Sequence, residues 1–184
     1  MPAKAVFPYG SWASPISADI IVAGGLSLSE IRVDGNNIYW LEGRPAEAGR
    51  SVVVRRSVNG EESDQIPAGF NARTGVHEYG GGVYAVGSGT IYFSNWEDQR
   101  IYRVVENGLP QALTDPPEIA SGDRYADLTI SGDSLWVCCV RERHHTQGEP
   151  TNDLVAISAT EPGLLQILTS GHDFYSSPRL SPDG

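Results

Sequence analysis

Short apolar runs alternate with turn-forming residues along most of the chain, and this pattern predicts strands rather than helices. Three runs resemble one another and recur at a spacing of roughly 45–50 residues, the length of one repeat unit. They are Ile38–Leu41, Ile91–Phe93 and Leu135–Val140. Each is nearly continuously apolar, as expected for a strand that is covered on both faces. Tight-turn residues precede each run, at 34–37, 87–89 and 131–133.

The other strands of each unit repeat as well. First strands are expected at Glu30–Val33, Val83–Val86, Asp127–Ile130 and Pro178–Leu180, ahead of the turns. Third strands are expected at Ser51–Val54, Arg100–Val104 and Asp153–Ile157, and fourth strands around Ile66, at Gln111–Thr114 and at Gln166–Thr169. Hairpin turns at Asn59-Gly60, Asn107-Gly108 and Pro162-Gly163 join third to fourth strands. The longest loop is expected between second and third strands, from Arg141 to Asn152.

Four antiparallel strands per unit at this period are typical of a β-propeller blade. The expected fold class is therefore all-β: a propeller of four-stranded antiparallel blades, incomplete in this chain, with about three blades and the start of a fourth. Residues 1–27 are expected to form a leader with one short helix after Pro15, and 28–184 the partial propeller. The blades are expected at approximately 28–71, 72–118 and 119–171, and the start of the fourth at 172–184. An irregular all-β fold without true repeats is the alternative.

Charge and composition narrow the classes of partner. The 184 residues include 13 Lys and Arg against 23 Asp and Glu, a net charge of −10. Because phosphate binding needs a basic face, nucleic acid is not expected as a partner. The sequence contains no apolar run long enough to span a membrane and shows no secretory signal, so we expect a cytoplasmic protein without a membrane partner. The two cysteines, Cys138 and Cys139, are expected to be reduced and packed.

The densest cluster of functional side chains lies at the head of the second unit. Arg73, His77, Glu78 and Tyr79 fall within seven positions and are followed by the glycines 80–82. Consecutive glycines allow positive φ angles or the close approach of another backbone. We therefore expect these four residues to stand at the end of a sheet, next to a neighbouring strand.

Similar chemistry precedes the later turns. Tyr125, next to Arg124, and Tyr175 occupy positions comparable to Tyr79. Because the first strands of propeller blades line the central channel, these residues are expected to surround one opening. Two interpretations stay open: the cluster binds a substrate, or its polar groups only bond neighbouring strand ends and fix the packing of the blades.

Metal and nucleophilic chemistry are not expected. His144 and His145 are adjacent in a polar segment, and no cysteine or histidine stands at the usual ligand spacing, so no metal or other cofactor is expected. A Gly-x-Ser-x-Gly motif, which exposes a nucleophilic serine on a strained turn, does not occur in the sequence. We therefore predict no catalytic residue in this chain. The tryptophans Trp40, Trp96 and Trp136 are expected to pack between blades.

Three segments carry a family resemblance. Arg73–Gly81 with its His-Glu-Tyr-Gly-Gly core, Ile91–Asn95 and Asp173–Gly184 resemble the N-terminal propeller of prolyl oligopeptidase family serine peptidases, in the branch of acylaminoacyl-peptidases and dipeptidyl aminopeptidases. The leader, with 8–12 and 14–16, is similar to the segment before the first blade. In that family a propeller caps an α/β-hydrolase domain that carries the Ser-Asp-His triad, and the hydrolase half lies almost wholly C-terminal.

The resemblance implies a propeller segment that gates or grips short peptides for a C-terminal α/β-hydrolase domain of the same polypeptide. On this hypothesis Arg73, His77, Glu78, Tyr79, Arg124, Tyr125 and Tyr175 face the substrate. A carboxylate such as Glu78 would hold the amino group of a peptide. The alternative is a non-enzymatic scaffold for protein–protein interaction, resembling the Tol-associated propeller protein; a lactonase-type metal propeller is a more distant one.

Overall fold

The computed structural model describes residues 6–11, 14–22, 25–106 and 108–181. Its strands form three four-stranded antiparallel sheets, each a simple up-and-down meander in chain order. Sheet 1 contains β1 (Ser27–Asp34), β2 (Asn37–Arg44), β3 (Arg50–Arg56) and β4 (Glu62–Asp64). Sheet 2 contains β5 (Tyr84–Gly87), β6 (Thr90–Ser94), β7 (Ile101–Val105) and β8 (Gln111–Ala112). Sheet 3 contains β9 (Asp123–Ile130), β10 (Trp136–Arg143), β11 (Thr151–Ser158) and β12 (Leu165–Ser170).

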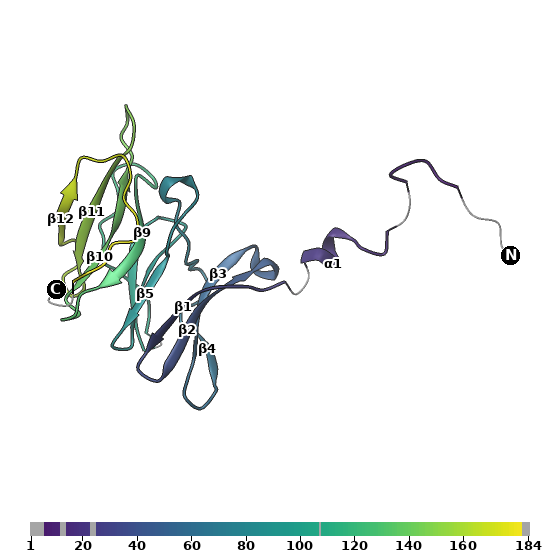
Figure 1. Cartoon of the computed structure of the whole chain (residues 1–184), viewed down its shortest axis with the longest axis horizontal. Coiled ribbons are helices and arrows are strands. Elements are labelled where there is room, and N and C mark those ends of the chain that lie inside the picture. The colour runs from purple at the N-terminus through teal and green to yellow at the C-terminus, as the bar shows by residue number, and fades with distance from the viewer. Residues whose placement is uncertain (1–5, 12–13, 23–24, 107, 182–184) are drawn as a thin grey trace.

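The described residues include three short helices. They are the α-helix α1 (Ala18–Val22) and the 3-10 helices η1 (Pro45–Glu47) and η2 (Val76–Glu78). The segment containing α1 extends away from the three sheets (Figure 1). No helix in the described part of the chain is long and apolar enough to cross a membrane.

The sheets stack side by side, because the middle sheet presents a different face to each neighbour. Ile91 and Phe93 of β6 pack with Tyr39 and Leu41 of sheet 1 in one hydrophobic core. Tyr92, between them in sequence, belongs to a second core shared with sheet 3. Side chains alternate between the two faces of a strand, so one apolar strand can serve both interfaces. The first strands also contact one another, β5 lying between β1 and β9 (Figure 1).

This arrangement confirms the predicted all-β fold, a partial propeller of four-stranded antiparallel blades. The hairpins at Asn59-Gly60 and Pro162-Gly163 are present, with both glycines at φ +84°. Asn107 and 182–184, part of two other predicted turns, lie outside the described residues. Cys138 and Cys139 are free and buried, as expected. The residue boundaries of the blades stay predictions.

Three sequence-based expectations about elements need correction. The predicted loop Arg141–Asn152 is shorter, because β10 continues to Arg143 and β11 begins at Thr151. The strand expected around Ile66 ends earlier, at Asp64, and Ile66 is instead buried in the core. No strand forms at 178–180, because a strand needs a hydrogen-bonding partner and none of the described residues pairs with this segment.

Acidic residues in β-bulges link the first strands. Glu30 in β1 (φ +50°) and Asp127 in β9 (φ +58°) both have left-handed backbones where the register shifts. The carboxylate of Glu30 accepts the backbone N–H of Val83. Oδ1 of Asp127 accepts the N–H of Gly82, and Oδ2 accepts that of Ser177, each at 2.7 Å. A carboxylate in a bulge therefore ties each outer sheet to the middle sheet.

Candidate functional site

The cluster at 73–79 stands on a short, strained piece of backbone. Val76–Glu78 form η2, in which His77 (φ +52°) and Glu78 (φ +66°) are both left-handed. Gly80, at φ +88°, completes the turn. A Cβ on Gly81 would lie 2.9 Å from the Cβ of Ala126, so the predicted close approach to a neighbouring strand is present. The glycines therefore let η2 sit directly against β9.

A buried carboxylate of β10 fixes this backbone. Glu142 is 5% exposed, and its Oε2 accepts the backbone N–H of His77 at 2.8 Å. Its Oε1 lies 2.7 Å from Nε2 of His144 and 3.4 Å from the guanidinium of Arg124. A buried carboxylate is stable only when several donors satisfy it. Glu142 thus holds η2 on sheet 3, although it lies 65 residues further along the chain.

Arg124 in β9 connects the buried acid to an exposed one. Its Nη1 donates to the carbonyl oxygen of Gly75 at 2.8 Å and to Oε1 of Glu78 at 2.6 Å. The Glu78 side chain is 80% exposed. The hydrogen bond from Arg124 holds the pKa of Glu78 below its usual range. No partner for Oε2 of Glu78 is found among the described residues. This carboxylate oxygen can therefore accept a hydrogen bond from solvent or from a ligand.

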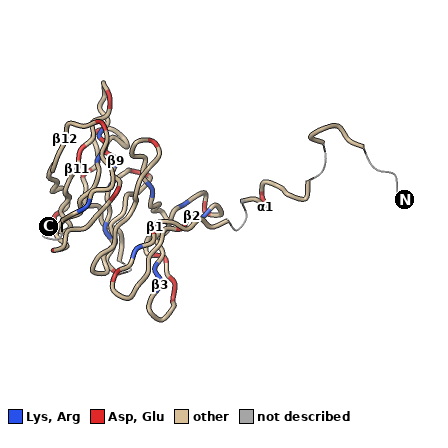
Figure 2. Tube along the Cα trace, viewed as in Figure 1, with Lys and Arg blue, Asp and Glu red and all other residues tan. Residues whose placement is uncertain are grey.

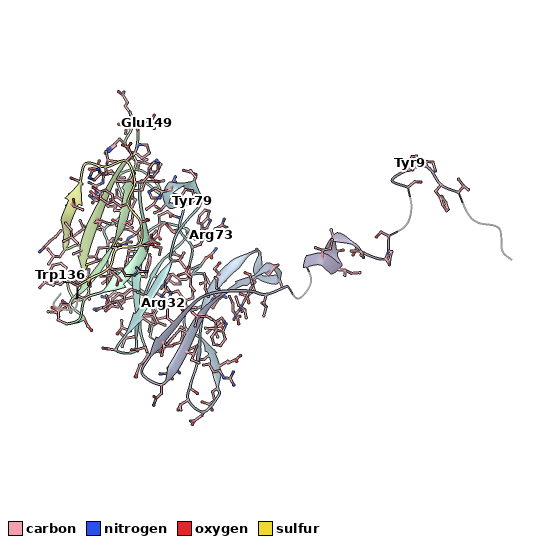
Figure 3. The ribbon with its side chains drawn as sticks, viewed as in Figure 1. Tyr9, Arg32, Arg73, Tyr79, Trp136 and Glu149 are labelled. Atoms are coloured by element: carbon pink, nitrogen blue, oxygen red, sulfur yellow. The ribbon has the colours of Figure 1, made fainter. Side chains whose placement is uncertain are left out.

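The predicted residues partly gather around one pocket of about 370 Å³. Four of them line it, namely Arg73, Glu78, Tyr79 and Arg124. Of these, Arg73 and Tyr79 can be seen near each other in Figure 3. Trp96 and Glu97 line it too. The guanidinium carbon of Arg73 lies 4.3 Å from the centre of the Trp96 ring, a cation–π contact. The pocket thus combines aromatic rings with charges of both signs.

His77 lies beside this pocket. Its Nε2 is 3.1 Å from Oδ1 of Asn152, and the amide of Asn152 donates to the carbonyl oxygen of Asp173. Because Oδ1 only accepts, Nε2 of His77 carries the hydrogen, and Nδ1 can accept the hydroxyl of Tyr79 at 3.4 Å. The ring also packs edge-on against Phe174, with centroids 5.0 Å apart. His77 therefore connects η2 with β11 and with the segment around Phe174.

The two remaining candidates lie elsewhere. Tyr125 is 3% exposed and lines a second cavity, of about 520 Å³, which is formed by sheet 3 and by the segment that follows β8. Burial raises the pKa of its hydroxyl. Tyr175 packs against the small core of Val76, Ala126 and Val140, and its buried hydroxyl has no partner among the described residues. The similar sequence positions of the three tyrosines do not give similar exposure, since Tyr79 is 82% exposed.

Sequence reasoning missed three residues of the site. Glu142 and Asn152 were assigned to a loop, and Trp96 was expected to pack between blades but is 37% exposed at the pocket. Glu142 and Asn152 act through contacts with residues far away in the chain, for which the sequence has no local signal. For Trp96, the neighbouring Glu97 was a signal of a surface position.

Three metal-type ligands come together in the described part of the chain: Glu78, Glu142 and His144. The guanidinium of Arg124 already lies between the two carboxylates, within 2.6 Å of one and 3.4 Å of the other. The guanidinium already supplies the positive charge that balances the two carboxylates, so we propose no metal ion there. Arginines are otherwise interspersed with Asp and Glu over the three sheets (Figure 2).

Fold and pocket define an all-β propeller segment with a polar and aromatic rim, and comparison with known proteins makes the class more specific. No family model matches the chain. No curated protein matches it either. Among solved structures, it is similar to a Mycobacterium tuberculosis puromycin-hydrolyzing peptidase, with 37% identity and a TM-score of 0.85 over 98% of this chain.

A puromycin hydrolase is also similar, with 31% identity and a TM-score of 0.84 over 98% of this chain. A mutant of puromycin hydrolase complexed with PGG is similar as well, with 31% identity and a TM-score of 0.85 over 97% of this chain. This chain spans 30% of the length of each of these proteins. The resemblance to the propeller of prolyl oligopeptidase family peptidases is thereby confirmed.

Proposed function

We propose that the chain is the propeller segment of a serine peptidase that hydrolyses short peptides, and that the rim pocket grips the substrate. The active serine would belong to a C-terminal α/β-hydrolase domain of the same polypeptide. The observation that supports this proposal is the similarity to peptidases over almost the whole of this chain but only 30% of theirs. The relatives hydrolyse puromycin by name, and the same reaction class is proposed for the full polypeptide.

The geometry around Glu78 supports a role in binding a substrate amine. Arg124 holds one carboxylate oxygen and keeps the group ionised, while the other oxygen has no partner among the described residues. The backbone of Glu78 is fixed by the His77–Glu142 hydrogen bond. A preoriented carboxylate can accept a charge-assisted hydrogen bond from the ammonium group of a peptide. His77 and Tyr79 would form the neighbouring wall, whereas Tyr125 and Tyr175, which lie outside this pocket, would not contact the substrate there.

The test is Glu78→Gln in the full-length polypeptide. Loss of a charged hydrogen bond costs on the order of 1.5–3 kcal/mol, so kcat/KM for short peptides with a free amino terminus should fall at least about tenfold. The melting temperature should barely move, because Glu78 is exposed. Measuring both quantities separates binding from stability.

The matched control is Glu62→Gln, which removes the same charge from exposed β4 in sheet 1. It should leave kcat/KM unchanged. A large fall in melting temperature with unchanged kcat/KM would assign Glu78 to blade packing. A full-length polypeptide that cleaves no peptide would instead favour the non-enzymatic scaffold.

A further inference from the structure

Arg73 is a positioned cation whose guanidinium has no acceptor among the described residues. Its backbone N–H donates to the carbonyl oxygen of Ser94 at 3.1 Å, which fixes the start of its side chain beside the pocket. Its guanidinium carbon lies 4.3 Å from the centre of the Trp96 ring. Among the described residues, no carboxylate or carbonyl oxygen accepts a hydrogen bond from this guanidinium. Stacking on an aromatic ring holds a guanidinium in one plane and leaves its edge N–H groups available.

The other arginine of the pocket differs in this respect. Arg124 donates to Gly75, to Glu78 and to Glu142, so its charge is neutralised inside the protein. Of the two arginines that line the pocket, Arg73 is therefore the one whose guanidinium can bind an incoming anion. This is notable in a chain of net charge −10, in which carboxylates outnumber cations.

We propose that Arg73, held on Trp96, binds the C-terminal carboxylate of a short peptide. This inference rests on the proposed peptidase function and specifies the substrate class as peptides with a free carboxyl terminus. A guanidinium matches a carboxylate with two parallel N–H···O bonds. The carboxylates of Glu78 and Glu97 also line the pocket, and they would oppose a doubly charged phosphate more than a singly charged carboxylate.

The dimensions of the pocket agree with a small terminal group. Its volume is about 370 Å³, and Tyr79 and Trp96 supply apolar surface for the last side chain of a peptide. With Glu78 as the amine-binding group and Arg73 as the carboxylate-binding group, one rim carries acceptors and donors for the two ends of a peptide. Glu78 and Arg73 would bind either two different peptides or the two ends of one short peptide. A comparison of a peptide acid with its amide responds only to the carboxylate, and so tests Arg73 in either case.

The experiment compares a tripeptide acid with the same tripeptide as its C-terminal amide, cleaved by the full-length polypeptide. The wild-type protein should prefer the acid by roughly ten- to hundredfold in kcat/KM, the range expected for a charged hydrogen-bonded pair. Arg73→Gln should lower kcat/KM for the acid so that the acid-to-amide ratio falls toward one. Arg73→Lys should restore only part of the ratio, because an ammonium lacks the planar fork. Trp96→Leu should reduce the ratio as well, since it removes the ring that holds the guanidinium.

The control is Arg56→Gln, which removes an equal charge from an exposed position at the far end of β3. It should leave the ratio unchanged. A wild-type ratio near one, or an equal loss for acid and amide in Arg73→Gln, would overturn the inference. A third substrate, a tripeptide amide with a carboxylate on a side chain, identifies which carboxylate is bound. If Arg73→Gln lowered kcat/KM for this substrate as strongly as for the acid, the inference would also be overturned. If neither acid nor amide is cleaved by the wild-type protein, the proposed function fails instead.

Discussion

Breaking the buried ion pair between Arg141 and Asp153 should destabilise the protein more than any change at its surface. The two residues face each other across β10 and β11, and the guanidinium donates to both carboxylate oxygens, at 3.0 and 2.6 Å. Their side chains are only 5% and 11% exposed. Because both side chains are largely shielded from solvent, a charge left without its partner would be poorly hydrated.

The size of the effect follows from this burial. Removing one partner of a buried pair costs about 3–5 kcal/mol, since it leaves an uncompensated charge. For a chain of this length, 1 kcal/mol corresponds to roughly 2–4 °C, so the melting temperature should fall by about 6–20 °C. We expect this result for both Arg141→Met and Asp153→Leu. The free energy of unfolding of the double variant should lie within about 1 kcal/mol of the wild-type value, because two apolar side chains need no charged partner.

Urea denaturation followed by circular dichroism measures the free energy of unfolding of all four proteins. The combined cycle gives the coupling between the two side chains. A loss below about 1 kcal/mol in either single variant would mean that the pair behaves like an exposed ion pair. A double variant as unstable as the sum of the singles would show that the side chains act independently. Either result refutes the argument.

Two further predictions concern the contacts between sheets. Burial raises the pKa of Glu30 above 4.5, so its protonated form is favoured in the folded state. Relative to Glu30→Gln, the wild-type free energy of unfolding should therefore fall as the pH rises from about 4.5 through this raised pKa. If urea denaturation gave the same pH dependence for both proteins, this prediction would be wrong. Gly81→Ala would place a Cβ 2.9 Å from that of Ala126 and should cost about 1–3 kcal/mol, measured by urea denaturation, whereas Gly132→Ala, at a position with open space, should cost less.

Local chemistry carries the information that made the fold predictable. Turns at Asn59-Gly60 and Pro162-Gly163 set where the chain reverses, and the apolar middle strands are long enough to be recognised without knowing their partners. Because each sheet is a meander of neighbouring segments, these short-range signals are sufficient to order its strands. The cluster at 73–79 could be found for the same reason, since its residues are close in sequence.

The remainder of the site depends on pairing at long range. Arg141 and Glu142 have the composition of a loop, and they become strand residues only because Asp153 neutralises one and the backbone of His77 bonds the other. The exposure of Tyr79 and the burial of Tyr125 likewise depend on where η2 meets β9, which is not visible in the spacing of tyrosines. The sequence indicates which chemistry is present, and the packing of the sheets decides which groups reach the pocket.

The left-handed backbone at His77 and Glu78 has a consequence for how this region can evolve. Each non-glycine residue in such a conformation costs on the order of 1 kcal/mol or more, whereas glycine adopts it without that cost. Selection for stability alone would therefore replace Glu78 by glycine, and the carboxylate beside Arg124 would be lost. A functional requirement for this side chain would oppose that drift, so the site carries a trade-off between stability and activity.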